Sequence, residues 1–255
     1  MTQNQINDIK PAIKNIAQVI KTSLVILDCE TSGLSIERDQ ILTFAAIRIE
    51  PTGQFSLLTH KIKPTIEISK EASAVHGLYI KDLEQYGEFK DYAKEIFEFI
   101  NKCTLAGFNS NKFDIPLIKN QLKSAGFELD TSMGTYDVYE VFKKHNRQRL
   151  QEAFFYYLNE EIKDAHDSLG DVKSTIRILA AQLDREKLTP TEITQKYIDE
   201  KPKGNQVIIK QGDQFIWNVG KHKGKKLSEL DTGFKKWVLT RDFDQQTKDI
   251  VKKFL

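Results

Sequence analysis

The sequence predicts an α/β protein in which a mixed sheet with flanking helices is followed by a small α+β domain. Three observations predict this fold class. Apolar, strand-like segments dominate residues 24–63, helical stripes alternate with short strands over residues 89–184, and a polar stretch precedes a basic C-terminal segment. A chain of 255 residues, 40% of them hydrophobic, can form one large domain and one small one.

A helix and three strands are expected first. Isoleucines recur every three or four positions over residues 6–20, which predicts an amphipathic helix in an N-terminal extension over residues 1–21 that docks on the body of the protein. Strands are then predicted at Leu24–Glu30, Ile41–Glu50 and Phe55–Lys63. Turn signals at Gly33 and Gly53 separate them, so we expect an antiparallel meander.

Helices and strands alternate in the next part of the chain. A helical stripe from Phe89 to Ile100 precedes a short strand at Thr104–Phe108, and a further helix runs from Pro116 and stops at Gly126. Beyond it we expect a strand near Tyr136, helices over Val138–Lys144 and Leu150–Leu158, and a long helix that carries Leu169 to Leu183. The main domain is therefore predicted over residues 22–184.

A polar linker over residues 185–204 is predicted to lead into a small domain over residues 205–255 with two short strands and two helices. This small domain holds 11 Lys and Arg against 6 Asp and Glu, a net charge of +5, whereas the rest of the chain has a net charge of −3. Such an asymmetry is typical of a basic module that holds a polyanion for an acidic catalytic module, although it also arises by chance.

The composition excludes several classes of protein. Apolar runs of only a few residues, such as Leu24–Leu27, are too short to cross a bilayer. The first residues lack the apolar region of a secretory signal, so we expect a cytoplasmic protein. Two cysteines, Cys29 and Cys103, can form neither a multi-disulfide framework nor a four-thiolate zinc site, and both are expected to be buried thiols.

Two carboxylates lie at the end of the first predicted strand. Asp28 and Glu30 are two residues apart, so both side chains leave the same face while Cys29 points to the other. Paired carboxylates on an apolar strand repel each other unless a hard cation such as Mg²⁺ or Mn²⁺ neutralises them. The alternative, a strand that simply ends in a polar turn, is equally compatible with this pair.

Three more residues have simple structural explanations when each is taken alone. Asp114 directly precedes a helix and matches an N-cap. Asp171 closes the sequence Ser168-Leu169-Gly170-Asp171, which matches a capping box, and a lone histidine such as His166 is usually solvated or hydrogen-bonded. The whole set favours a joint site, because these residues follow Asp28 and Glu30 on elements that can converge.

Together these motifs resemble the DEDDh branch of the 3′-to-5′ exonucleases, which includes the proofreading exonucleases of bacterial replicative polymerases. The three matching segments are Leu27–Leu34, Asn109–Leu117 and His166–Asp171. Relatives often carry Ala where Ser168 stands, and a His-Asn pair where Asn109-Ser110 stands. The resemblance, which covers roughly residues 22–183, implies a ribonuclease H-like fold.

The resemblance also implies the chemistry. Two divalent cations, Mg²⁺ or Mn²⁺, would be held by four acids, and a histidine would take the proton from the attacking water. These residues are Asp28, Glu30, Asp114 and Asp171 as metal ligands, and His166 as the base. Substrate contacts are implied for Thr31, Leu34, His76, Asn109 and Phe113, with His76 at the periphery of the site, whereas Asp137 is expected to be structural.

In the C-terminal segment aromatic residues interleave with lysines. Its Gly220–Lys225 pattern followed by Trp237 resembles the small domain appended to exodeoxyribonuclease X-like enzymes. Four lysines are expected to contact phosphates: Lys221, Lys223, Lys225 and Lys226. Trp217 and Trp237 are expected inside the small core, because so short a module needs its aromatic residues there.

These features predict a metal-dependent 3′-to-5′ exonuclease that releases nucleoside monophosphates from single-stranded or frayed DNA, with DNA polymerase or repair proteins as partners. One alternative is an RNA-directed exoribonuclease, because nothing in the sequence indicates a preference concerning the 2′-hydroxyl. The other is a catalytically silent module that binds nucleic acid or tethers a polymerase. Retention of all four acids and of His166 argues against the silent module, because clustered acids without a metal are costly.

Overall fold

A computed structural model of the chain describes residues 7–143, 149–162, 167–185, 208–211, 214–217, 222, 224–240 and 245–255. The chain divides into two compact units, residues 1–197 and residues 198–255. The described residues contain no helix that is long and apolar enough to cross a membrane.

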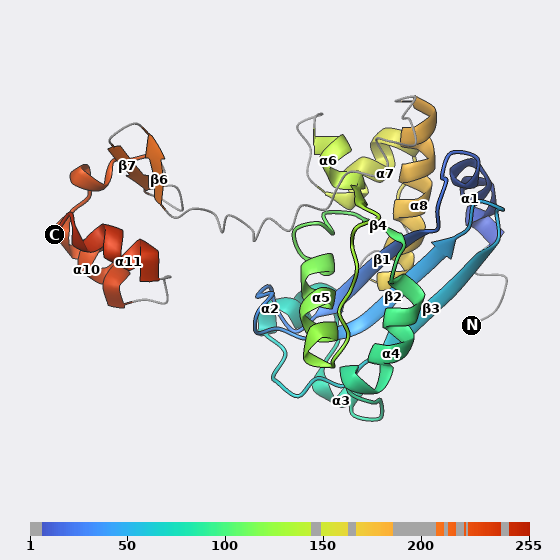
Figure 1. Cartoon of the computed structure of the whole chain (residues 1–255), viewed down its shortest axis with the longest axis horizontal. Helices are drawn as coiled ribbons and strands as arrows, with labels where there is room; N and C mark the ends of the chain where they lie inside the picture. Colours follow the sequence, from blue (N-terminus) through green and yellow to red (C-terminus); the bar gives the residue numbers. More distant parts are fainter. Residues whose placement is uncertain are drawn as a thin grey trace. The chain divides into compact units, whose positions relative to one another are not determined.

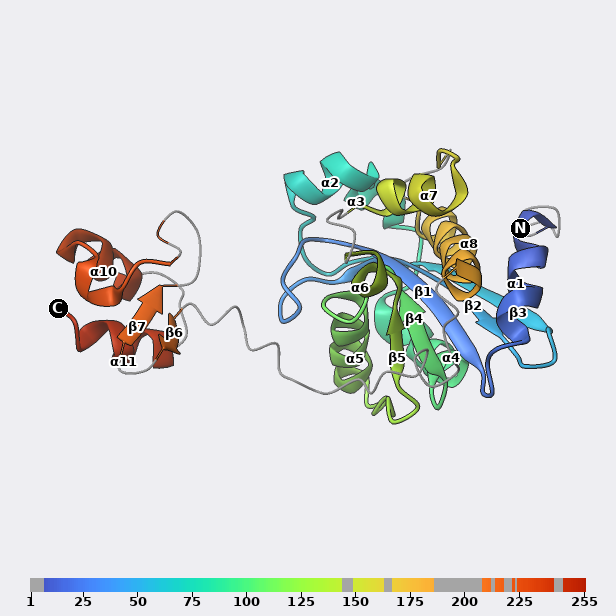
Figure 2. The same cartoon turned by 90° about the horizontal axis from the view of Figure 1, so that it is seen from above.

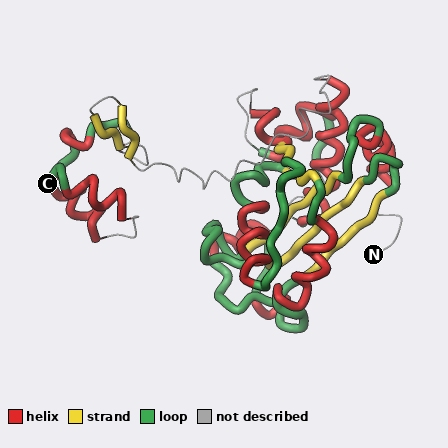
Figure 3. The backbone as a smooth tube through the Cα atoms, viewed as in Figure 1, coloured by secondary structure: helices red, strands yellow, loops and turns green. Residues whose placement is uncertain are grey.

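A five-stranded mixed sheet forms the centre of the first unit (Figures 1 and 3). Its strands are β1 (Leu24–Thr31), β2 (Ile41–Ile49), β3 (Phe55–Lys61), β4 (Thr104–Gly107) and β5 (Thr135–Asp137), in the order β3-β2-β1-β4-β5. β1, β2 and β3 pair antiparallel, as the sequence predicts, whereas β4 runs parallel to β1 and β5 parallel to β4. The mixed α/β fold class is thereby confirmed.

Helices cover both faces of this sheet (Figure 2). One face packs against α1 (Lys10–Ala17), α7 (Leu150–Leu158) and α8 (Ser168–Arg185), and the short helix α6 (Val138–Phe142) adds Val138 and Phe142 to the same core. The other face packs against α4 (Phe89–Ile100) and α5 (Asp114–Ser124). Ile9, Ile13 and Ile16 are buried in the α8-side core, so the N-terminal helix docks as the isoleucine stripe predicts.

The alternation of side chains along β1 decides which face receives the acids. Leu24 and Ile26 point into the core beneath α8, whereas Val25, Leu27 and Cys29 point into the core beneath α4 and α5. Successive side chains of a strand point to opposite faces, so Asp28 and Glu30 continue the row on the α8 face.

Two short helices between β3 and α4 are not predicted from the sequence. α2 (Lys70–His76) begins after Ser69, whose hydroxyl accepts a hydrogen bond from Ala72 N, and ends at Gly77 with φ of 73°. α3 (Ile80–Leu83) follows directly. Both are too short to show a helical repeat of apolar residues. His76 is the last residue of α2.

The second unit has a two-stranded antiparallel sheet of β6 (Ile208–Gln211) and β7 (Gln214–Trp217), a 3₁₀ helix η4 (Leu227–Glu229), α10 (Thr232–Thr240) and α11 (Gln245–Lys252). Its core comprises Ile208, Trp217, Leu227, Leu230, Val238 and Val251. Trp217 is 2% exposed, as expected, but Trp237 is 44% exposed, so the expectation for Trp237 is wrong. On α10 the buried face runs through Lys235 and Val238, and the helical repeat turns Trp237 away from it.

Candidate active site

Three of the predicted acids meet between the sheet and α8. Asp28 and Glu30 come from β1, and Asp171 comes from the first turn of α8. Each contributes a carboxylate oxygen, and these three oxygens lie within 4.8 Å of one another. Residues from distant parts of the sequence therefore form one acidic cluster, as the joint-site interpretation requires.

Asp114 reaches the same strand from the opposite side. It is buried at the start of α5, and its Oδ1 accepts a hydrogen bond of 3.1 Å from Cys29 N. The simple N-cap explanation is wrong, because Phe113 occupies the cap position and no side chain caps this helix. The carboxylate is instead anchored to the β1 backbone beside Asp28, whose electrostatic environment it affects.

The start of α8 also differs from the capping-box expectation. Asp167 Oδ2 accepts a hydrogen bond of 3.1 Å from Gly170 N, which is the role that the sequence assigned to Ser168. Ser168 lies inside the helix, is buried, and its hydroxyl accepts a hydrogen bond of 3.1 Å from Thr43 Oγ1. Because the capping group is Asp167, the Asp171 carboxylate remains directed toward Asp28 and Glu30.

The acids perturb one another strongly. Burial raises the pKa of Asp28 well above its ordinary value, and the negative charges of Asp114 and Asp171 raise it further. Burial, followed by the charge of Asp171, raises the pKa of Glu30 to about 8. Burial raises the pKa of Asp114 to about 7, even though the hydrogen bond from Cys29 N acts in the opposite direction. Among the described residues, the charges that shift these three pKa values are therefore all negative.

The chemistry of these acids fits a divalent cation. All four acids offer carboxylate oxygens, which are the ligands that Mg²⁺ and Mn²⁺ prefer, and a bound cation would favour the ionised form of each acid. The donor set and the raised pKa values are both what a site for hard cations requires.

A second group of contacts, which the sequence analysis missed, holds these acids in place. Thr43 Oγ1 accepts a hydrogen bond of 3.3 Å from Glu30 N while it donates to Ser168, and thus links β1, β2 and α8. The only signal for this link was a threonine within a largely apolar strand.

Asp137 holds the segment that leads into α5. Its carboxylate accepts hydrogen bonds of 2.8, 3.1 and 3.0 Å from the backbone nitrogens of Asn109, Asn111 and Tyr139. Asn109 has a positive φ of 61°, a conformation that asparagine tolerates better than most residues. Asp137 is thus a structural acid that shapes the backbone leading to Asp114.

The predicted substrate-contact residues lie in different environments. Leu34 is 89% exposed in the turn after β1, whereas Thr31 is buried and its hydroxyl donates to Gly33 O at 2.8 Å. His76 Nε2 lies 3.2 Å from Thr31 O, so α2 is joined to the end of β1. Asn109 and Phe113 are half-buried, and Phe113 packs against the core beneath α4 and α5.

Other predicted residues are placed elsewhere or are not described. Lys225 and Lys226 belong to the second unit; Lys225 is exposed, and Lys226 Nζ lies 3.8 Å from Glu229 Oε1. His166, Lys221 and Lys223 lie outside the described residues. Their roles remain predictions from the sequence.

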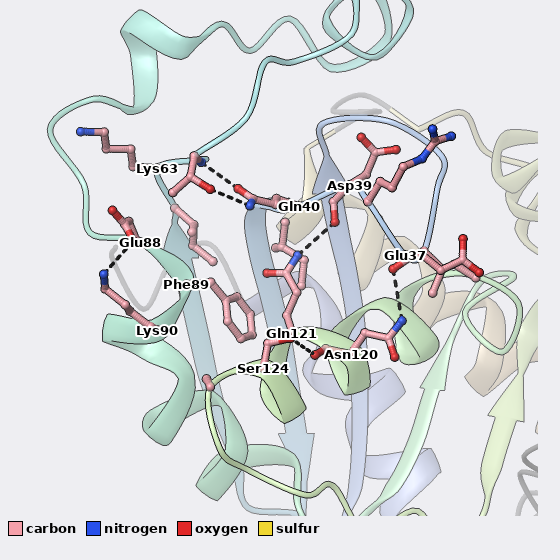
Figure 4. Close-up of a pocket in the computed structure, with 16 residues that line it drawn as sticks. Glu37, Asp39, Gln40, Lys63, Glu88, Phe89, Lys90, Asn120, Gln121 and Ser124 are labelled. Atoms are coloured by element: carbon pink, nitrogen blue, oxygen red, sulfur yellow. Dashed lines mark hydrogen bonds and ion pairs between the residues drawn. The ribbon is translucent and has the colours of Figure 1, made fainter.

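A pocket of about 280 Å³ lies behind the turn that carries Leu34 and contains none of the four acids (Figure 4). At its wall Asn120 Nδ2 donates to Ile36 O at 3.2 Å and Gln121 Nε2 donates to Asp39 O at 3.4 Å. These bonds tie the turn to α5. The pocket therefore lies beside this turn and is separate from the acidic cluster.

Comparisons with known proteins place the first unit in a family. Residues 25–179 match the family model described as exonuclease. The chain is 24% identical over 171 residues to the PolC-type DNA polymerase III of Caldanaerobacter subterraneus subsp. tengcongensis, a match that covers 65% of this chain and 12% of that protein. It is 28% identical over 107 residues to the epsilon subunit of DNA polymerase III of Buchnera aphidicola, covering 38% and 44% respectively.

Solved structures show the same fold. E. coli exonuclease I in complex with a dA16 oligonucleotide is 19% identical, with a TM-score of 0.59 over 66% of this chain and 42% of that one. Exonuclease I of Methylocaldum szegediense is 22% identical, with a TM-score of 0.57 over 65% and 41%. The matches span less than half the length of each of these relatives. Because the family model matches more than half of the chain, this protein belongs to the exonuclease family and has its ribonuclease H-like fold.

Proposed function

We propose that the first unit is a DEDDh-type 3′-to-5′ exonuclease that hydrolyses phosphodiester bonds at the 3′ end of single-stranded or frayed DNA and releases nucleoside monophosphates. The observation that carries this proposal is the convergence of Asp28, Glu30 and Asp171, with Asp114 anchored beside them. Membership of the exonuclease family supports hydrolysis of nucleic acid.

The four acids would hold divalent cations, Mg²⁺ or Mn²⁺. A pair of such ions, when bound, supplies positive charge to the attacking and leaving oxygens of a phosphodiester. The protein contributes the positions of the acids: β1 fixes Asp28 and Glu30, the Cys29 backbone anchors Asp114, and α8 presents Asp171.

We assign the general base to His166. In the sequence it directly precedes Asp167, the residue that caps α8, and the first turn of this helix carries Asp171. An unperturbed imidazole has a pKa of about 6.5 and can accept a proton from water near neutral pH. Leu34, in the turn after β1, is assigned to the terminal nucleotide because its exposed side chain offers apolar surface for a base. Thr31, the last residue of β1, is assigned to the same nucleotide because it leads into this turn.

DNA is proposed as the substrate on the basis of the relatives. Two are DNA polymerase III proteins and another was solved with a DNA oligonucleotide. We propose on the same basis that the chain acts with a DNA polymerase or repair proteins, in proofreading or in DNA repair. The basic unit over residues 205–255, joined by the linker over residues 185–204 to the catalytic domain over residues 22–184, would grip the nucleic acid through its lysines.

The test is a cleavage assay on 5′-labelled DNA and RNA oligonucleotides, with and without Mn²⁺. The wild-type protein should shorten DNA stepwise from the 3′ end only when Mn²⁺ is present, and Asp171→Asn should abolish this shortening. Asp184→Asn is the matched control, because Asp184 is an exposed acid on the same helix and should be dispensable. Faster shortening of RNA would indicate an exoribonuclease, and wild-type protein that leaves both substrates intact would indicate a silent binding module.

A further inference from the structure

The second unit exposes one large aromatic ring beside its lysines. Trp237 is 44% exposed on α10, and among the described residues of this unit Leu255 is the other large apolar side chain that is exposed. A small domain gains stability by burying tryptophan, as it does with Trp217. Trp237 therefore differs from Trp217 in presenting part of its aromatic surface to solvent.

The exposed ring is supported from beneath. Phe234 stacks on Trp237 with ring centroids 5.5 Å apart at an interplanar angle of 24°, and meets the buried Trp217 edge-on at 5.0 Å. His222 packs on the same phenylalanine at 4.3 Å. Because Trp237 rests on rings that belong to the core, its orientation is already set, and a ligand would need to order little when it binds.

The loop segment that carries Lys225 is hydrogen-bonded to the strand of this aromatic cluster. Gly224 N donates to Trp217 O at 2.7 Å and Trp217 N donates to Lys225 O at 2.8 Å, so the loop pairs with β7 at the strand that carries the buried tryptophan. Lys225 and Lys236 are both exposed, and neither forms an ion pair with a described residue. Positive charge thus accompanies the exposed ring on both the loop and α10.

We propose that Trp237 is a stacking site for an unpaired base of single-stranded DNA, with Lys225 and Lys236 contacting the neighbouring phosphates. An aromatic face stacks on any base, and lysines attract the phosphate backbone without sequence preference. The exposed ring together with the excess of lysines in this unit matches the flat bases and the negative backbone of a single strand. The proposal rests on the proposed function for the class of ligand, and assigns to the second unit a binding site distinct from the acids.

Affinity of the full chain for a fluorescent oligothymidylate, measured by anisotropy in EDTA so that no cleavage occurs, tests the site. Loss of one stacked base weakens single-strand binding about 5- to 150-fold, so Trp237→Leu should fall in this range, while Trp237→Phe should keep most of the affinity. Leu255→Ala is the matched control, since it removes exposed apolar surface from the same unit and should bind as wild type. Wild-type affinity of Trp237→Leu would overturn the proposal.

Salt dependence and fluorescence separate the two kinds of contact. The slope of log affinity against log salt is negative, and Lys225→Ala and Lys236→Ala should each reduce its magnitude by about 0.7, whereas Trp237→Leu should leave it unchanged. The chain has two tryptophans, so Trp217→Phe leaves Trp237 as the sole reporter, whose emission single-stranded DNA should quench and a blunt duplex should not. Equal quenching by the duplex would contradict base stacking.

Failure of this site and failure of the exonuclease proposal are distinguishable. Asp171→Asn should lose cleavage and retain the quenching of Trp237, because the acid belongs to the first unit. If the wild-type protein does not cleave yet its Trp237 is quenched, the exonuclease proposal fails and the stacking site stands. If the wild-type protein cleaves DNA and its Trp237 is not quenched, the stacking site fails and the exonuclease proposal stands.

Discussion

Stability in the absence of metal should fall as pH rises, because the acidic cluster resists ionisation. The pKa of Glu30 rises from 4.5 to about 8 on folding, so between these values the folded protein binds more protons than the unfolded chain. The free energy of unfolding then decreases with increasing pH. At about 1.4 kcal/mol per pKa unit the full shift corresponds to roughly 5 kcal/mol, which solvent screening of the half-buried side chain reduces to roughly 2–3 kcal/mol.

Thermal melting in EDTA between about pH 5 and pH 8 measures this effect. For a unit of this size roughly 2–4 °C correspond to 1 kcal/mol, so the melting temperature should fall by about 5–10 °C over this range. Mn²⁺ should restore it at the higher pH, because a ligand that binds only the folded state stabilises it.

Glu30→Gln should reduce the pH dependence of the melting temperature, since the amide does not ionise, whereas Asp184→Asn on the exposed face of α8 should leave it unchanged. A melting temperature that is constant or rises with pH in EDTA, or a slope that Glu30→Gln leaves intact, would refute the electrostatic reasoning.

Three further substitutions test the supporting contacts. Asp137→Ala removes the acceptor of three backbone hydrogen bonds and should lower the free energy of unfolding by about 3 kcal/mol in a urea titration; a loss below about 1 kcal/mol would mean that these bonds contribute little. Thr43→Val breaks the link to Ser168 and should cost about 1–2 kcal/mol and reduce turnover, whereas unchanged turnover would show that the link does not position the acids. Leu34→Ala should leave the melting temperature unchanged, because the side chain is exposed, but weaken binding of the 3′ end, and an unaltered KM would remove its assignment.

The elements that position the site were predictable where periodicity is strong. The alternation along β1 places Asp28 and Glu30 on one face, and the stripe on α8 leaves Asp171 at its start. The two short helices near His76 were not predictable, because each is too short to display a repeat.

Single-residue interpretations were wrong where tertiary contacts outweigh local preference. Asp114 matches a cap in sequence, yet its carboxylate accepts a hydrogen bond from Cys29 N, in a strand far away in the sequence. Ser168 likewise does not cap α8: its hydroxyl accepts a hydrogen bond from Thr43, and Asp167 caps the helix instead. Trp237 is exposed because of its angular position on α10. The number of aromatic residues in the segment gives no information on that position.

The most direct test of the central claim is the location of manganese in crystals of the protein soaked in Mn²⁺, read from anomalous scattering. We expect manganese peaks enclosed by the carboxylates of Asp28, Glu30, Asp114 and Asp171, and the loss of these peaks in Asp171→Asn. Manganese bound only elsewhere, with these four carboxylates empty, would contradict it.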